Sequence, residues 1–517
     1  MTGNYNNQLY NEYEKILEDH IRLKKIYRDQ KDEIGILQSD LDKEEKENVK
    51  IKGELQEKIL ENEALKKEIL RLNGLLGADG TNSGIPTSKT PINKKKVVPN
   101  SREKSNKKRG GQAGHGKSIL KAFDDEEVNE IKKHTPNECP HCGGEVEEYS
   151  DSIIKDELDY EVVVKKIRHH FIQCHCKKCE KDFHAPIPNN LKEKNQYGSG
   201  VKALGLSLMN IGNVSLSKVR KMIYGLTETE IHPTEGWLVK QQKSAALSLT
   251  NFMEDLKKHC LKLPIIHWDD TVIDIDKKRA CLRFYGDEKV AYYTAHNKKN
   301  KECLDKDGIL PLLSKETVVM HDHNKVNYNE CYSFSNIECN VHLLRDLQRV
   351  VDDVGHEWAK GLKSLLQATN EERNRSIERG EKEFSSEYTQ EFYRKYHRFV
   401  LDGYREDELH PGDYCSIKVK TLLNRLMKYK SNYTAWILNF NLPFSNNLSE
   451  RSLRGVKSKM KVAGQFHNEE MAQNYAIIKS YIETCYRNNI NQMEALVRLC
   501  TGKPYTVNEI FLDKATD

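Results

Sequence analysis

Apolar residues recur with a heptad spacing through the first 76 residues of the chain. With position a at Leu9 and position d at Tyr13, 14 of the 20 a and d positions up to Leu76 are apolar. A helix cannot bury such a stripe by itself, so residues 1–76 are predicted to form a coiled coil. The coiled coil would be intramolecular, or would join two or more copies of the chain. The alternative is a single charged helix that lies on the protein's own surface.

Two apolar runs in the second half of the chain end at acidic residues. Residues 263–266 lead to Asp269 and Asp270, and residues 317–320 lead to Asp322. Short runs rich in β-branched residues are typical of buried strands, so each Asp is expected where its strand emerges from the sheet. This position is common in ordinary turns, so neither Asp indicates a functional site by itself.

The segments around these two strands complete a recognisable order. Residues 279–285 and 290–295 have the composition of two hairpin strands, with Gly286 at the turn. Residues 256–480 therefore begin with a strand that leads to Asp269, continue with two hairpin strands, and then have a strand that leads to Asp322. This is the order of elements in a ribonuclease-H-like catalytic core. Helical patterns at about residues 343–440 predict a helical insertion within it.

A carboxylate among cations marks the end of this core. Glu450, Arg454 and Lys457 are spaced i, i+4 and i+7, so they share one face of a predicted helix. A metal-binding carboxylate flanked by cations suits the binding of a phosphodiester, and the same helix carries Arg451 and Lys461. The alternative is a solvated ion pair between Glu450 and Arg454.

Composition agrees with a multidomain α+β protein. The chain has 517 residues, 31% of them charged, and a net charge of +5; its mean hydropathy is −0.76. It has no apolar run of membrane-spanning length and no basic, then apolar leader, so neither a membrane nor secretion is expected. Its 13 cysteines then indicate a reducing, cytoplasmic compartment and metal binding in place of disulfides.

Residues 77–124 have no periodicity and are rich in Gly, Pro, Ser, Asn and Lys. Between residues 94 and 121 there are ten Lys or Arg and one acid, Glu103. This composition predicts a flexible linker whose cations, including Lys107, Lys108 and Arg109, neutralise DNA phosphates without reading sequence. The alternative is a linker that only aids solubility.

Two Cys-x-x-Cys pairs fall within residues 125–192. Their spacing predicts one tetrahedral structural zinc ion in a zinc ribbon, with ligands Cys139, Cys142, Cys176 and Cys179. Cys174 is a surplus candidate, and residues 160–172 are expected to form the hairpin of the ribbon. A redox pair is the alternative.

Helical segments flank the predicted catalytic core. Residues 193–255 contain short amphipathic helices separated by a turn, which is compatible with a helix-turn-helix that binds DNA. A helical hairpin that packs on the core explains the same pattern. Residues 481–517 are expected to form a helical tail.

Four motifs resemble the transposases of the insertion sequence 66 family, and the resemblance covers nearly the whole chain. They are His-Trp-Asp-Asp-Thr at residues 267–271, His-Asp-His-Asn-Lys at residues 321–325, Cys-Asn-Val-His-Leu-Leu-Arg-Asp-Leu at residues 339–347, and the segment at residues 446–461 that begins Asn-Asn-Leu-Ser-Glu-Arg. The resemblance implies a DNA transposase of the DDE type, in which the catalytic acids are Asp269 (and not Asp270), Asp322 and Glu450.

The resemblance also implies cofactors and partners. The three acids would hold two Mg²⁺ or Mn²⁺ ions for phosphoryl transfer. Arg451, Arg454, Lys457 and Lys461 would hold terminal phosphates, and His342 and Arg345 would lie near the catalytic pocket and contact DNA. The partners would be the terminal repeats of the element, target DNA and small accessory transposition proteins, in a bacterial cytoplasm at the nucleoid.

Three alternatives remain open. A decayed copy would bind DNA without cutting it, and a structure-selective nuclease would cut DNA without needing element ends and without joining strands. At the level of the site, Cys339, His342, His321 and His323 could form a second metal site. The family resemblance instead places His342 near the catalytic pocket, and His321 and His323, which flank Asp322, are expected to shape that pocket.

Overall fold

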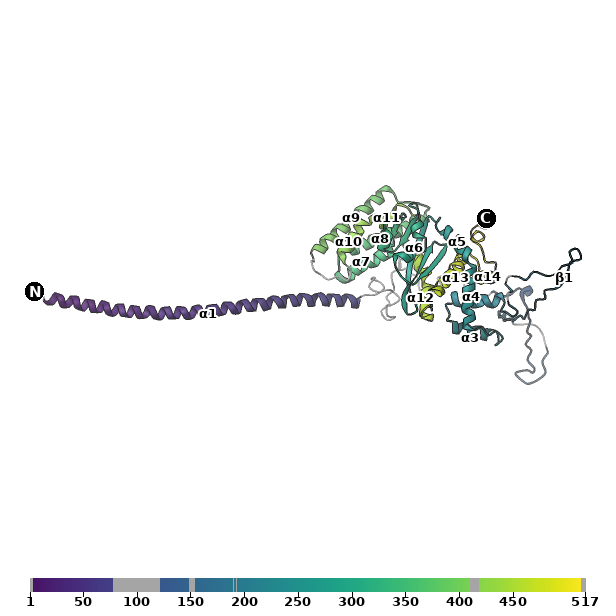
Figure 1. Cartoon of the computed structure of the whole chain (residues 1–517), viewed down its shortest axis with the longest axis horizontal. Helices are drawn as coiled ribbons and strands as arrows, with labels where there is room; N and C mark the ends of the chain where they lie inside the picture. Colours follow the sequence, from purple (N-terminus) through teal and green to yellow (C-terminus); the bar gives the residue numbers. More distant parts are fainter. Residues whose placement is uncertain are drawn as a thin grey trace. The chain divides into compact units, whose positions relative to one another are not determined.

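The computed structural model describes residues 3–77, 121–147, 154–188, 190–191, 193–409 and 418–512, which are drawn in colour in Figure 1. The chain divides into two compact units. The first comprises Met1–Val98, Arg345–Ser364 and Lys395–Arg425, and the second comprises Pro99–Leu344, Leu365–Arg394 and Leu426–Asp517. Most of the predicted basic linker, including Lys107, Lys108 and Arg109, lies outside the described residues. No helix in the described ranges is long and apolar enough to span a membrane.

The predicted heptad segment forms one uninterrupted helix, α1, at Gly3–Gly77. Its 75 residues correspond to a length of about 110 Å at the rise of an α-helix. Wherever its side chains are described they are exposed, and Leu9, Ile16 and Leu23 at predicted core positions are each more than half exposed. The apolar stripe therefore lies in solvent in the single chain, and the coiled coil stays a prediction.

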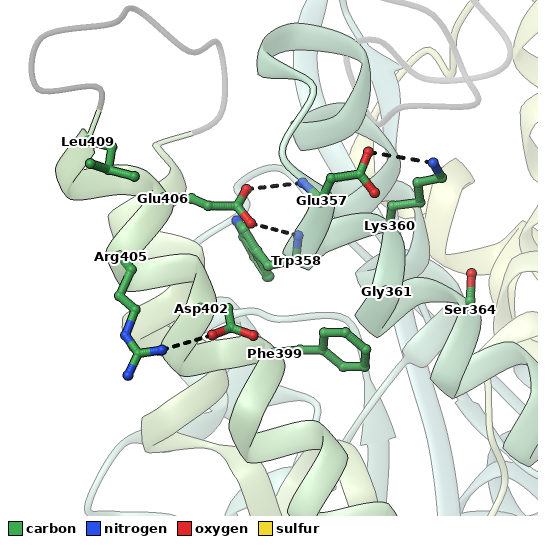
Figure 2. A pocket seen from close by; sticks show the side chains of 10 residues that line it. All are labelled: Glu357, Trp358, Lys360, Gly361, Ser364, Phe399, Asp402, Arg405, Glu406 and Leu409. Atoms are coloured by element: carbon green, nitrogen blue, oxygen red, sulfur yellow. Dashed lines mark hydrogen bonds and ion pairs between the residues drawn. The ribbon is translucent and has the colours of Figure 1, made fainter.

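The segment predicted as a helical insertion, at about residues 343–440, forms five helices within its described residues. They are α7 at Asn340–Val354, α8 at Glu357–Glu378, α9 at Ser386–Leu409, α10 at Val419–Lys428 and α11 at Lys430–Leu438. In the first unit α8 packs closely on α9, because Gly361 leaves room for the ring of Phe399, which would clash with a Cβ at this position. Glu406 of α9 accepts hydrogen bonds from the first backbone N–H groups of α8, beside a surface cavity of about 500 Å³ (Figure 2).

A five-stranded mixed sheet forms the centre of the second unit. Its strands are β3 at Ile265–Ile275, β4 at Lys278–Gly286, β5 at Ala291–His296, β6 at Val318–His321 and β7 at Ser335–Glu338. Their order across the sheet is β5-β4-β3-β6-β7. Strands β3, β4 and β5 are antiparallel neighbours, whereas β6 and β7 run parallel to β3. The predicted mixed α+β fold is confirmed, and both hairpin strands lie where the sequence predicted them.

One strand end differs from the prediction. Asp269 was expected where β3 leaves the sheet, but β3 continues to Ile275. The reason is that the two edges of β3 have different partners. Its parallel pairing with β6 ends at His267, whereas its antiparallel pairing with β4 continues through Ile275. Asp269 therefore lies just past the end of the parallel ladder and within the hairpin ladder.

Helices cover both faces of this sheet. They are α2 at Ser199–Asn210, α3 at Leu216–Leu226, α4 at Glu235–Ser248, α5 at Thr250–Cys260, α12 at Asn447–Ala463, α13 at Glu469–Arg487, α14 at Gln492–Cys500 and α15 at Val507–Leu512. On one face, Ile266 and Trp268 share a core with α2, α4, α5, α13 and α14. On the other face, Ile273 and Ile275 pack against α12.

The predicted helical segments have a structural role in this packing. The helices of residues 193–255 bury Leu206 and Leu238 in the same core as the sheet, which agrees with the helical hairpin that packs on the core. The predicted boundaries at residues 255 and 480 fall inside α5 and α13, because both helices contribute to that core.

The hairpin within residues 125–192 also lies at a different position from the one predicted for a zinc ribbon. Residues 160–172 contain no strand. The hairpin is instead formed by β1 at Gln173–His175 and β2 at Asp182–His184, which pair antiparallel. Its turn contains Cys176 and Cys179, and Glu180 adopts a φ of 52°. The cysteine turn thus sets the register of the hairpin, which the β-rich composition of residues 160–172 did not indicate.

A buried lysine joins α12 to α2. Lys459 is only 8% exposed, and its ammonium donates to the backbone carbonyl of Met209 at 2.9 Å. It also lies 5.4 Å from the ring centroid of Tyr475. Burial lowers the pKa of Lys459 to about 8, because removing the ammonium from water disfavours its charged form.

Replacing Lys459 with Met is expected to stabilise the protein at pH 7 by about 1–3 kcal/mol, because the variant no longer buries a charge. The folded-state pKa, about 8, lies below that of the unfolded chain, so the unfolded chain binds more protons between these two values. The stability of the unmodified protein therefore rises with pH in that window. Melting temperatures measured from pH 7 to pH 10 should show the advantage of K459M shrinking. The exposed Lys457 is the matched control, and an advantage that does not change with pH would contradict the explanation.

Candidate functional site

Three acids from distant parts of the sequence lie on one side of the sheet in the second unit. Asp269 is on β3, Asp322 directly follows β6, and Glu450 is in the first turn of α12. Side chains alternate between the two faces of a strand. Asp269 shares its face of β3 with Ile273 and Ile275, which pack against α12. It therefore lies on the side of the sheet that carries Glu450.

Asp270 lies on the opposite face of β3. Its carboxylate accepts a hydrogen bond from the ammonium of Lys299 at 2.6 Å. The alternation along β3 thus separates two neighbouring acids that the sequence could separate only by family resemblance. Asp269 lies on the α12 side, and Asp270 forms an ion pair on the other side.

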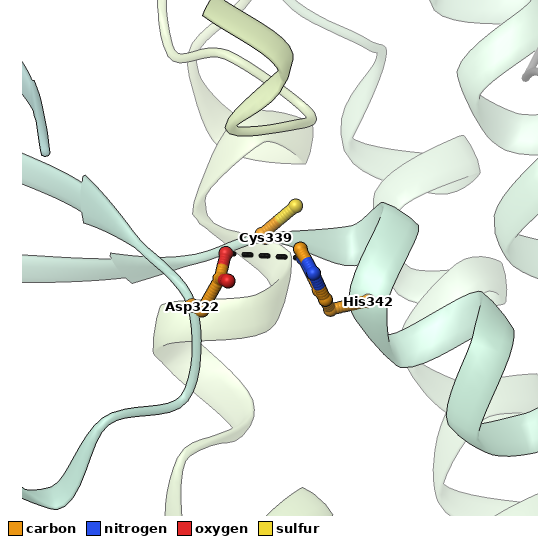
Figure 3. A group of neighbouring side chains, drawn as sticks. All are labelled: Asp322, Cys339 and His342. Carbon is orange, nitrogen blue, oxygen red and sulfur yellow. Dashed lines mark ion pairs between the residues drawn. The ribbon is translucent and has the colours of Figure 1, made fainter. Parts of the chain in front are cut away.

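His342 of α7 connects the other two acids. Its Nδ1 lies 3.0 Å from an oxygen of Asp322, and its Nε2 lies 3.6 Å from an oxygen of Glu450. The imidazole therefore stands between the two carboxylates, one on each side of the ring. Cys339 is next to this pair, and one ligand atom from each of Asp322, Cys339 and His342 lies within 4.8 Å of the others (Figure 3).

The charges at the site favour a bound cation. Burial raises the pKa of Asp269 well above its usual value, and the charges of Asp322 and Asp270 raise it further. Burial by itself would lower the pKa of His342, but Cys339 and Asp322 raise it well above its usual value. Carboxylates held this close are stabilised by positive charge. Their hard oxygen ligands fit Mg²⁺ or Mn²⁺, so the residues present suit the metal that the sequence predicts.

Asn446 fixes the start of α12 against the sheet, and it is fully buried. Its Nδ2 donates to the carbonyl of Trp268 at 2.9 Å, and its Oδ1 accepts from His267 Nδ1 at 3.1 Å and from the hydroxyl of Ser449. Its backbone N–H donates to the sulfur of Cys339 at 3.2 Å. One residue thereby joins β3, the start of α7 and the helix that carries Glu450.

A second network holds Asp322. The ring of His321 lies 2.5 Å from the carbonyl of Asp322 and 2.8 Å from the side chain of Asn336. Glu338, at the end of β7, is 1% exposed and accepts hydrogen bonds from His323 and Tyr328. Burial alone would raise the pKa of Glu338, but these hydrogen bonds and the nearby histidines lower it. His321 and His323 therefore contact Asp322 and Glu338, and their role in shaping the pocket stays a prediction. Glu338 was missed, although an acid at the end of a buried strand is a detectable signal.

Cations lie along the exposed side of α12. Arg451, Arg454, Lys457 and Lys461 are exposed, and Arg451 forms a loose ion pair with Glu288 at 3.4 Å. The side chain of Glu450 contacts His342, whose Nε2 lies 3.6 Å from a carboxylate oxygen of Glu450. Arg345 lies on α7 in the first unit.

The two Cys-x-x-Cys pairs that were predicted to bind zinc, Cys139 with Cys142 and Cys176 with Cys179, are called the cysteine hooks, and both adopt the same local conformation. Gly143 N–H donates to the carbonyl of Cys139 at 2.8 Å, and Glu180 N–H donates to the carbonyl of Cys176 at 2.8 Å. Backbone N–H groups lower the pKa of both Cys139 and Cys176, which favours the thiolates that bind metal. Among the described residues, the one cluster of three or more ligand atoms within 4.8 Å is that of Asp322. The two hooks are thus formed but are not brought together.

A comparison with protein families gives one match. The model of the transposase IS66 family matches residues 213–474, a range that includes all three acids, Cys339, His342 and the cations of α12. The heptad segment and the cysteine hooks lie outside it. No curated protein matches the chain.

Replacing Asn446 with Ala is expected to destabilise the second unit by about 1–3 kcal/mol, because buried groups on β3 lose their hydrogen-bond partner. The matched control is the exposed neighbour Asn447, whose change to Ala is expected to stay within about 0.5 kcal/mol. Denaturant unfolding of both variants measures the difference. Equal effects of the two substitutions would contradict the role given to Asn446.

Proposed function

Because the chain belongs to the IS66 family of transposases, we propose that it cuts the ends of an insertion element and joins them to target DNA. The observation that carries this proposal is the placement of Asp269, Asp322 and Glu450 on one side of the sheet, with His342 between the last two. The order and directions of the strands support a ribonuclease-H-like core for this chemistry.

The three acids would hold Mg²⁺ or Mn²⁺. Bound in pairs, such ions activate an attacking oxygen and stabilise the leaving oxygen of an in-line displacement at phosphorus. The protein's own contribution is to fix the ligands before DNA arrives. Asn446 sets the position of α12, and the hydrogen bond from His321 sets the Asp322 backbone. Preorganised ligands do not have to move during the reaction, which lowers its barrier.

The cations of α12 would bind the DNA backbone. Arg454 and Lys457 follow Glu450 by one and two turns and are exposed, so phosphates bound there would run toward the acids. Arg451 would exchange its weak contact with Glu288 for a phosphate, and Lys461 would extend the track. Contacts of this kind position DNA and depend on salt, but they do not read its sequence.

The segments that precede the family match would assemble the protein into oligomers, stabilise its fold and add affinity for DNA. A second copy of α1 would bury the exposed heptad stripe in a homodimer or a higher oligomer. One structural zinc ion would join the two cysteine hooks and fix the fold of residues 125–192. The basic linker, with Lys107, Lys108 and Arg109, would add salt-dependent DNA affinity. Arg345, accessory proteins and a place at the bacterial nucleoid belong to the same proposal.

Replacing Glu450 with Gln is expected to leave DNA binding intact and to lower cleavage and joining by ~10³-fold or more, because a metal ligand supplies several kcal/mol of transition-state stabilisation. The assay uses labelled duplexes that carry the DNA flanking this reading frame, with Mg²⁺. The matched control is Asp270→Asn on the opposite face of β3, which should cut within about tenfold of the unmodified protein. Cleavage retained by E450Q would contradict the assignment. Binding without cutting by any of the proteins would favour a decayed copy.

Replacing Cys139 with Ser is expected to remove one equivalent of zinc and to lower the melting temperature, because binding of a structural zinc ion is coupled to folding. Cys174 provides the control, since it is the surplus cysteine and C174S should keep its zinc. Metal analysis and thermal unfolding of the two variants measure both effects. A C139S protein with unchanged zinc content and melting temperature would contradict a zinc ribbon.

A further inference from the structure

A sulfur ligand lies inside the proposed magnesium site. Cys339 is 1% exposed, and its Sγ lies within 4.8 Å of a ligand atom from both Asp322 and His342. Figure 3 shows Asp322 and His342 facing each other beside this cysteine. The three residues come from the end of β6, the junction of β7 with α7, and the first turn of α7. Rigid elements therefore hold all three positions.

This set of ligands differs in kind from the three acids. Mg²⁺ prefers carboxylate oxygens and water, whereas a thiolate with an imidazole and a carboxylate suits Zn²⁺ or Cd²⁺. Three protein ligands with a fourth position open to water are a familiar zinc arrangement. Tetrahedral zinc holds its nitrogen and oxygen ligands roughly 3.4 Å apart. His342 Nδ1 and Asp322 are 3.0 Å apart, so small shifts would admit the ion.

The start of α12 fixes the position of the Cys339 sulfur. The backbone N–H of Asn446, which directly precedes α12, donates to this sulfur at 3.2 Å. The sulfur is thereby held beside the ligand atoms of Asp322 and His342. Glu450 contacts the opposite nitrogen of His342, Nε2, at 3.6 Å. It therefore adds negative charge nearby and does not belong to the set of ligands around Nδ1.

We propose that Asp322, Cys339 and His342 bind a thiophilic divalent cation such as Zn²⁺, and that this ion competes with Mg²⁺ for Asp322. An ion bound in this way occupies a carboxylate that the proposed reaction requires, so it inhibits the transposase. The inhibition rests on the proposed function, whereas the binding of the ion does not.

Cobalt tests the site directly, because Co²⁺ bound to thiolate and nitrogen ligands absorbs visible and near-ultraviolet light. The full-length protein, stripped of metal, is titrated with Co²⁺ and the number of thiolate-bound ions is counted. The cysteine hooks bind the same number of Co²⁺ ions in every variant, so the site is measured by the difference in ion count between a variant and the unmodified protein. We expect C339S to bind one thiolate-coordinated Co²⁺ fewer than the unmodified protein. Excess Mg²⁺ should weaken Co²⁺ binding at this site in the unmodified protein.

Two further variants make the result decisive. The side chain of His342 is partly exposed. The variant H342A should bind Co²⁺ at this site ~100-fold more weakly or worse, because even the outer partners of a metal ligand contribute 10–100-fold to metal affinity. E450Q keeps all three ligands and should bind the same number of thiolate-coordinated Co²⁺ ions as the unmodified protein, with an affinity at this site lowered by at most ~10–100-fold because Glu450 contacts the other nitrogen of His342. A folded C339S protein, judged by its thermal unfolding, that binds as many thiolate-coordinated ions as the unmodified chain would overturn the proposal. Because E450Q reports on cleavage and C339S on Co²⁺, failure of the proposed function and failure of this site are distinguishable.

Discussion

Asn446 hydrogen-bonds to the carbonyl of Trp268 on β3 and to the sulfur of Cys339 at the start of α7, and the position of Glu450 follows from these two contacts. Its backbone carbonyl also accepts the hydrogen bond from the N–H of Glu450. Residues nearly two hundred positions apart in the sequence are thereby held together by one buried amide. Breaking any of these hydrogen bonds would leave a buried polar group unsatisfied, which is costly, so the arrangement has little freedom to move.

This rigidity has an electrostatic consequence. The fold brings Asp269 and Asp322 close enough for each charge to oppose the other, and His342 provides a positive group between Asp322 and Glu450. Folding energy therefore holds together charges that would separate in water, and a cation relieves the repulsion. Under the proposals above, Cys339 would give the same place a soft ligand. The site would then discriminate among metals by the ligands that each ion prefers.

The sequence predicted the elements better than their ends. Composition and spacing were enough for α1, for the strands that carry Asp269 and Asp322, and for the helix with Glu450, because each depends on local periodicity. Composition and spacing failed where the pairing of distant segments decides where a strand or hairpin begins and ends. The strand with Asp269 continues because β4 pairs with it to Ile275, and the hairpin of β1 and β2 lies at residues 173–184 because a cysteine turn closes it. The sequence marks Glu338 only as an acid at the end of a strand, because its role comes from His323 and Tyr328, which fold against it.

Diffraction from crystals grown with Mn²⁺ tests the central claim most directly, because the anomalous signal of manganese locates each bound ion. The claim is that Asp269, Asp322 and Glu450 form one site for hard divalent cations. It predicts anomalous peaks bound by carboxylate oxygens of these three residues. Manganese that binds elsewhere in the second unit while these carboxylates remain without an ion would contradict it.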